Sequence, residues 1–111
     1  MVMAIIRPER LEQVKDALAA AGFHGMTVEH VLGRGGQRGV VHVGRGGESV
    51  TVDMLPKVKI EAVVQDEAVQ RAVEAIVAAA RTGHIGDGKI FVLPVEQVIR
   101  VRTGERDSAA V

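Results

Sequence analysis

Four short β-rich runs and two helical patterns alternate along this chain in the same order, twice. The β-rich runs are VMAIIR (2–7), MTVEHVLG (26–33), KVKIEAVV (57–64) and KIFVLPV (89–95). Between the first two runs, Leu11, Val14 and Leu18 recur at spacings of three and four, which marks one face of a helix. A second apolar stripe separates the last two runs and comprises Val69, Val73, Ile76, Val77 and Ala80. This order, β-α-β, loop, β-α-β, restricts the fold more than any other feature.

Two β-α-β units joined by a long connection predict an α+β fold, a ferredoxin-like βαββαβ sandwich with one antiparallel sheet and two helices on one face. We expect a single domain over residues 1–111, a loop without strong helical or strand period at about 36–54, and a C-terminal segment at 96–111. The other sheet face has no helix to cover it. Because the chain has two Phe and neither Tyr nor Trp, we expect this face to be aliphatic and buried against other copies of the chain, unlike the aromatic sheets that stack on RNA.

The composition excludes several classes of protein. A chain of 111 residues is long enough for one domain with one core. The absence of cysteine excludes disulfides, thiolate metal sites and thiol catalysis, and the 14 basic and 14 acidic residues leave no net charge to attract nucleic acid or an anionic membrane. The four histidines lack the close spacing typical of a metal site. The N-terminus lacks the features of a signal peptide and no apolar run approaches the roughly 20 residues of a membrane span, so we expect a soluble cytoplasmic protein.

Two glycine-rich turns are the least ordinary stretches, GRGGQRG (33–39) after the second β-rich run and GHIGDGK (83–89) before the fourth. In the predicted sheet the two turns lie at the same edge and face each other across a cleft. Glycines allow backbone N–H groups to converge on an anion, and Lys89 adds a positive charge. These turns therefore favour a phosphate-binding site.

Two arginines near the C-terminus point to the same chemistry. If RVR (100–102) is a short strand, Arg100 and Arg102 share one face and suit bidentate contacts with phosphate. The residues alone leave two interpretations open, a site for a phosphate-containing ligand and a set of surface turns with a solvated arginine pair. Neither a Walker motif nor a G-x-G-x-x-G fingerprint is present, so the usual nucleotide-binding folds are excluded.

Several stretches, in this order, closely resemble the PII nitrogen-signalling family: AIIRPERLEQVKDAL, GMTV, GRGGQRG, DMLPKVKIE, ARTG, TGHIGDGKIFVLPV and VIRVRTGERDSAAV. The resemblance covers nearly the whole chain, and its C-terminal part is the most specific. It implies a ferredoxin-like subunit in a compact homotrimer that binds ATP or ADP, with Mg²⁺ and 2-oxoglutarate, in the clefts between subunits. It also implies a regulator that is not an enzyme and that controls transporters, enzymes or transcription factors by direct contact.

The resemblance also implies roles for individual residues, none of them catalytic. Those implied to bind the nucleotide are Thr27, Gly35, Gln37, Glu61, Val63, Gly86, Asp87, Gly88, Lys89, Arg100 and Arg102. Those implied to bind 2-oxoglutarate are Gln37, Lys57 and Gly86, and Gln37 is also implied to hold Mg²⁺ with the ATP phosphates. Within the nucleotide set, the residues implied near adenine and ribose are Thr27, Glu61 and Val63, and those implied to reach the phosphates across the subunit boundary are Arg100 and Arg102.

Segment 36–54 corresponds to the mobile loop with which family members contact their partners. This chain has no tyrosine, so the nucleotidylated tyrosine of a common family form is absent, and Ser49 lies near its position as a candidate for modification or as a plain loop serine. Gly36 stands where many relatives carry an arginine that holds the phosphates, which leaves the preference between ATP and ADP open. Arg45 resembles the loop-tip arginine that ordinary members insert into an ammonium channel.

An ammonium transporter is therefore the expected partner, although two alternatives stay open. The GRGGQRG stretch resembles the nitrogenase-associated branch of the family, whereas TVDMLPK resembles the ordinary branch. The partner of a PII-like trimer could accordingly be nitrogenase, a metal-efflux protein or another transporter. The second alternative is a ferredoxin-like trimer with a role in metal tolerance.

Overall fold

The computed structural model describes residues 1–35, 39–43, 48–52 and 54–111. Its strands and helices are, in chain order, β1 (Val2–Ile6), α1 (Leu11–Ala20), β2 (Thr27–Gly33), β3 (Gly39–Val43), β4 (Glu48–Val52), β5 (Leu55–Ala62), α2 (Val69–Ala80) and β6 (Gly88–Val92). Short 3₁₀ turns cover Pro8–Arg10, Asp66–Ala68 and Asp107–Ala109. No helix in the described part of the chain is long and apolar enough to cross a membrane.

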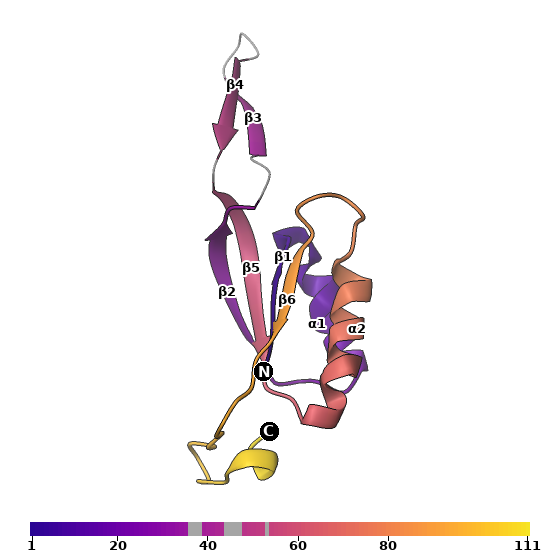
Figure 1. The fold of residues 1–111 in the computed structure, drawn as a ribbon, viewed down its shortest axis with the longest axis vertical. Coiled ribbons are helices and arrows are strands. Elements are labelled where there is room, and N and C mark those ends of the chain that lie inside the picture. Colours follow the sequence, from indigo (N-terminus) through magenta and orange to yellow (C-terminus); the bar gives the residue numbers. More distant parts are fainter. Residues whose placement is uncertain (36–38, 44–47, 53) are drawn as a thin grey trace.

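The main sheet contains β2, β5, β1 and β6 in that spatial order, and each neighbouring pair is antiparallel. Helices α1 and α2 lie side by side on one face of this sheet, as Figure 1 shows. The predicted ferredoxin-like α+β sandwich is therefore confirmed, and the four β-rich runs of the sequence supply its four strands.

The hydrophobic core lies between this sheet and the two helices. In β1 every second residue points toward the helices and is buried, and in β5 the same holds from Val58 to Ala62, as the period of two in these sequences requires. The residues of β1, β5, α1 and α2 that form the centre of the core are Val2, Ala4, Ile6, Val58, Ile60, Ala62, Val14, Leu18, Ala72 and Ile76. All are aliphatic and many are small, so the sheet and helices pack closely.

Segment 36–54, expected to lack regular structure, contains a two-stranded hairpin. β3 and β4 pair in antiparallel register from Gly39 opposite Val52 to Val43 opposite Glu48. The expectation was wrong because the runs GVVHV and ESVTV are rich in β-branched residues, and the glycines that obscure their period lie in the connection between them. Figure 1 shows this hairpin continuing beyond the end of β2 and β5.

The uncovered face of the sheet is not aliphatic, so that expectation was also wrong. Two cross-strand rows on this face, read from β2 to β6, are Thr27, Glu61, Met3 and Phe91, then Glu29, Lys59, Ile5 and Lys89. The cause is the alternation in KVKIE, which buries Val58 and Ile60 and turns the charged residues outward. Lys59 Nζ lies 3.3 Å from Glu61 Oε1 and 3.4 Å from Glu29 Oε1, and hydrogen bonds to these carboxylates, first that to Glu61, raise the pKa of Lys59.

The RVR segment is a turn and not the short strand that was expected. The Arg100 N–H donates to the Glu105 carbonyl at 2.8 Å, and the Gly104 N–H donates to the Arg100 carbonyl at 2.7 Å. Gly104 has a φ of 73°, a left-handed conformation that lets the chain reverse at this point. Since residues 100–102 do not form a strand, the argument that alternation puts Arg100 and Arg102 on the same face no longer applies.

Gly88, the first residue of β6, lies opposite Ile6 and leaves no room for a side chain. Its φ is 109°, and a Cβ atom would overlap the Ile5 carbonyl oxygen. We expect Gly88→Ala to lower the free energy of unfolding by about 3 kcal/mol or more, since backbone atoms cannot move aside as a side chain does.

Gly83→Ala is the matched control, because Gly83 has a φ of 88° but no atom within 4 Å of its Cβ position. It should cost only the strain of the left-handed conformation, about 1–2 kcal/mol. Urea unfolding at equal protein concentration measures both, and equal losses in the two variants would contradict a clash at Gly88.

Candidate functional site

The two glycine-rich turns meet at one end of the uncovered sheet face, as expected from the sequence. They border a cleft of roughly 340 Å³. Its lining comes from the end of β2 and the residues after it, the start of β5, and the loop that leads into β6, and comprises Gly33, Arg34, Gly35, Leu55, Lys57, Ile85, Gly86, Gly88 and Lys89 together with Ile5 and Phe91. Two segments about 50 residues apart in the sequence thus form opposite walls of one cleft.

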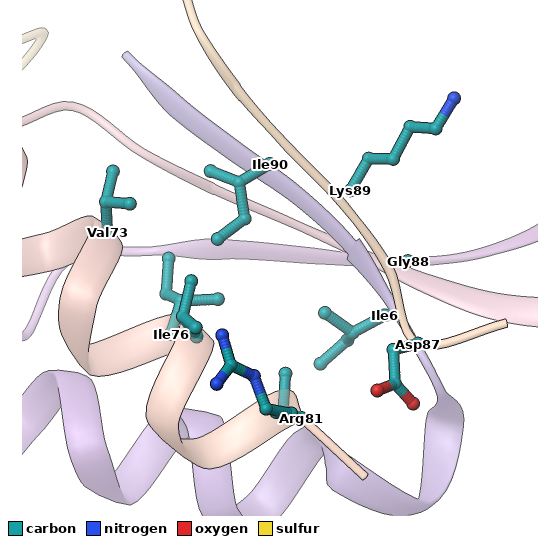
Figure 2. Close-up of a pocket in the computed structure, with 10 residues that line it drawn as sticks. Ile6, Val73, Ile76, Arg81, Asp87, Gly88, Lys89 and Ile90 are labelled. Atoms are coloured by element: carbon teal, nitrogen blue, oxygen red, sulfur yellow. The ribbon is translucent and has the colours of Figure 1, made fainter. Parts of the chain in front are cut away.

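The charge of this cleft is positive. Arg34, Lys57 and Lys89 line it, and its described lining includes no carboxylate. Lys89 reaches it because alternate residues of β6 face opposite sides of the sheet. Figure 2 shows Ile90 and Ile6 directed toward α2, where they border an apolar gap of about 310 Å³, while Lys89 points away from the helices. The cleft is therefore suited to an anion, whereas the gap beneath α2 belongs to the hydrophobic side of the sheet.

Lys57 connects the two walls of the cleft. Its side chain starts in β5, and its Nζ donates a hydrogen bond to the Gly86 carbonyl oxygen at 2.6 Å. Gly33 lies against the stem of this side chain, with the position of a Cβ only 3.2 Å from Lys57 Cγ. The ammonium group that the sequence predicts as an anion ligand is thus held, in this structure, by the main chain of the loop between α2 and β6.

Asp87 organises that loop. Its carboxylate accepts hydrogen bonds from Arg7 Nε at 3.0 Å, from the backbone N–H of Thr82 at 2.8 Å and from that of Gly83 at 2.9 Å, and it also accepts from Thr82 Oγ1. The hydrogen bonds from Thr82, first that from its hydroxyl, and those from Arg7 and Gly83 hold the pKa of Asp87 well below its ordinary value. The carboxylate is directed into the loop, which leaves the main chain of Asp87 as the part available to a ligand.

Arg7 is a site residue that the sequence did not reveal. Besides its bond to Asp87, its Nη2 donates to the Ile85 carbonyl at 2.7 Å, so it ties the loop to the end of β1. Its partners lie 78 and 80 residues away in the chain. The only signal in the sequence is a charged residue that directly follows an apolar strand, and many solvated arginines have that position.

The other predicted nucleotide ligands that the structure describes lie at the opposite end of the sheet. β2 extends from Thr27 to Gly33, and six residues of strand span about 20 Å. Glu61 lies beside Thr27, and Val63 follows β5 at the same end. The C-terminal segment is bound there as well, since Gln65 Nε2 donates to the Ser108 carbonyl at 3.1 Å.

The predicted site is thus divided into two parts within one chain. We call Gly35, Lys57 and residues 86–89 the loop half-site, and we call Thr27, Glu61, Val63, Arg100 and Arg102 the terminal half-site. Figure 1 shows the segment that carries both arginines below the sheet, at the end remote from the glycine turns. Arg100 Nη1 pairs with Glu105 Oε1 at 3.1 Å, so this guanidinium has a carboxylate partner in its own turn.

Three further predicted residues receive little or no structural description. Gln37 and Arg45 lie outside the described residues, so the predicted Mg²⁺ ligand and partner contact stay predictions. Ser49 belongs to β4, where it pairs with His42 across the hairpin, and its modification also stays a prediction. Among the described residues, no group of three or more His, Asp or Glu side chains is arranged to hold a metal ion.

The Asp87 network predicts a characteristic dependence of stability on pH. Because the pKa of Asp87 is lower in the folded protein than its ordinary 3.8, its contribution is present at neutral pH and is lost as the pH falls below that value. We expect Asp87→Asn to lower the melting temperature at pH 7, since an amide cannot accept from all these donors. The difference from the unsubstituted protein should shrink toward pH 3, and a difference that is constant from pH 7 to pH 3 would contradict the assignment.

Comparison with known proteins agrees with the motifs and the geometry. A family model described as nitrogen regulatory protein P-II matches residues 1–105. Nitrogen regulatory protein P-II 2 of Methanothermobacter thermautotrophicus is 57% identical over 110 residues, which cover 99% of this chain and 95% of the relative. Nitrogen regulatory protein P-II of Azospirillum brasilense is 54% identical and that of Nostoc punctiforme 57%, each over 110 residues covering 99% of this chain and 97% of the relative. The chain therefore belongs to the nitrogen regulatory protein P-II family.

Proposed function

We propose that this protein is a nitrogen-signalling regulator, not an enzyme, that binds ATP or ADP between its subunits and reports the ligand to a partner protein. The main support is the cationic cleft between the two glycine turns, with Arg34, Lys57 and Lys89 in its lining. Phosphate groups are bound by such combinations of lysine, arginine and glycine-rich main chain. In this proposal Lys89 and the amides of residues 86–88 hold the phosphates.

The nucleotide site is completed by a second subunit. The loop half-site and the terminal half-site lie at opposite ends of one sheet, so one nucleotide cannot contact both within a chain. A head-to-tail contact brings the loop half-site of one subunit to the terminal half-site of the next, and such contacts close into a ring when the rotation permits. We propose a homotrimer in which Arg100 and Arg102 reach the phosphates across the boundary, and in which the uncovered sheet face is buried.

Mg²⁺ and 2-oxoglutarate are proposed as further ligands of the same cleft. Lys57 and the main chain at Gly86 offer a cation and backbone groups to a carboxylate, and both border the cleft. The amide oxygen of Gln37 suits Mg²⁺, which prefers a few protein oxygens together with phosphate oxygens. The cleft would then report both nucleotide and 2-oxoglutarate.

The partner is proposed to be an ammonium transporter, contacted by the hairpin. β3 and β4 extend from the end of the sheet that carries the cleft (Figure 1), so ligands bound there lie at the root of the contact element. Arg45, in the connection of the hairpin, is the proposed contact residue. The protein would act from the cytoplasm and reach the membrane through this partner.

We expect Lys89→Ala and Arg102→Ala to weaken ATP binding by about tenfold to a hundredfold, since a hydrogen bond to a charged phosphate contributes about 1.5–3 kcal/mol. Lys15→Ala is the control, because Lys15 lies on α1 and pairs with Glu12 at 3.3 Å, away from both half-sites. Calorimetric titration measures the affinities, and an unchanged ATP affinity in both site variants would contradict the proposed site.

Mixing these two variants tests whether the site lies between subunits. Each homo-oligomer lacks one half-site everywhere, but a mixed ring places the intact loop of an Arg102→Ala subunit against the intact Arg102 of a Lys89→Ala subunit. We expect ATP binding to recover to at most one site per mixed trimer after denaturation and joint refolding. A site within one chain would show no recovery, and light scattering that finds a monomer at micromolar concentration would exclude the ring.

Capture of the partner from native membranes tests the regulatory role. We expect the protein to retain an ammonium transporter in ADP and to release it in Mg²⁺-ATP with 2-oxoglutarate. The reason is that ligands in the cleft would change the conformation of the chain where the hairpin joins the sheet. Arg45→Ala should reduce the capture. Equal capture in both ligand conditions, or no effect of the substitution, would rule out ligand-controlled docking through the hairpin.

A further inference from the structure

The hydrogen bond between Lys57 and Gly86 joins two elements that the proposed ligands also contact. The Lys57 Nζ approaches the Gly86 carbonyl oxygen to 2.6 Å across 29 residues of sequence. A bond from an ammonium group to a carbonyl is charge-assisted and stronger than a neutral one. Lys57 thus fixes a main-chain group of the loop.

Fixing that carbonyl also fixes the next amide. The Gly86–Asp87 peptide bond is trans and planar, so the Asp87 N–H points opposite to the Gly86 carbonyl. While the carbonyl faces Lys57, the Asp87 N–H faces away from it. The same reasoning applies one residue earlier, where Arg7 Nη2 holds the Ile85 carbonyl at 2.7 Å and orients the Gly86 N–H.

The backbone of Gly86 does not by itself keep this peptide in one orientation. Gly86 has a φ of 101°, which glycine adopts freely, so the peptide planes on either side of it can rotate at little cost. Its Cβ position is open except toward the Arg7 guanidinium, 3.2 Å away. The two cations therefore select one of several accessible orientations.

We propose that Lys57 is a positioning residue for the phosphate loop: its bond to the Gly86 carbonyl orients the Asp87 N–H as a donor for phosphate. The inference rests on the proposed function in that the loop binds phosphate. It adds a role for Lys57 when no carboxylate ligand is present.

The first test needs no nucleotide. Backbone amide NMR of the unsubstituted protein, Lys57→Met and Lys59→Met compares two lysine substitutions on the same face of the same strand. We expect the Gly86 and Asp87 amide resonances to move in Lys57→Met only. An unmoved Asp87 resonance in Lys57→Met, or an equal movement in Lys59→Met, would overturn the proposal whether or not the protein binds nucleotides.

The second test measures ADP affinity without 2-oxoglutarate. Loss of one oriented donor to a charged group should weaken ADP binding about tenfold in Lys57→Met, and Lys15→Met serves as the control for lost charge. The tenfold difference should persist between about 0.05 and 0.5 M NaCl, because salt screens a through-space effect of the ammonium but not the orientation of a peptide. A difference that disappears at high salt would overturn the positioning role. Failure of the unsubstituted protein to bind ADP would refute the proposed function, and the result of the first test would still stand.

Discussion

The carboxylate of Asp87 holds the loop between α2 and β6 in one conformation, and the cleft depends on that loop. A segment rich in glycine loses much conformational entropy when it is ordered, so it needs specific bonds to stay in place. Asp87 supplies them by accepting from two backbone N–H groups and from Arg7, at the end of β1. Because Arg7 directly follows β1 and bonds to Asp87 and to the Ile85 carbonyl, it fixes the loop relative to the sheet. The glycine turn after β2 therefore faces a wall of defined shape.

The antiparallel sheet then decides where the parts of the site lie. Neighbouring strands run in opposite directions, so the start of β2 lies beside the end of β5 at one end of the sheet, and the glycine turns lie at the other end. The terminal half-site shares its edge with the C-terminal segment, which is bound through Gln65 and Ser108. In the proposed trimer, a ligand that needs both half-sites would require two chains, so that binding and assembly would be linked.

The lysines on the uncovered face of the sheet have two different surroundings. Lys59, in the middle of the face, lies between the carboxylates of Glu29 and Glu61, so its charge is neutralised locally. At the end with the glycine turns, Lys57 and Lys89 line a cleft whose described lining holds no carboxylate. An anion is accordingly drawn to that end and not to the middle of the sheet. The hairpin of β3 and β4 begins at the same end of the sheet as this cleft (Figure 1).

The sequence by itself determined the four main strands, the two helices and the convergence of the glycine turns, because local periodicity sets the elements and the β-α-β order sets the sheet. It also determined the family, through motifs that extend along nearly the whole chain. Only the tertiary structure decided that Arg7 and Asp87 bond across 80 residues, that Lys57 holds the Gly86 carbonyl, and that Thr27 and Glu61 lie at the end of the sheet opposite the glycine turns. These features depend on distances between segments remote in sequence, which no local pattern encodes. The hairpin and the turn at Arg100 were missed for a related reason. Each depends on backbone hydrogen bonds between residues on either side of a glycine-containing turn, and the residue pattern of either segment alone does not reveal them.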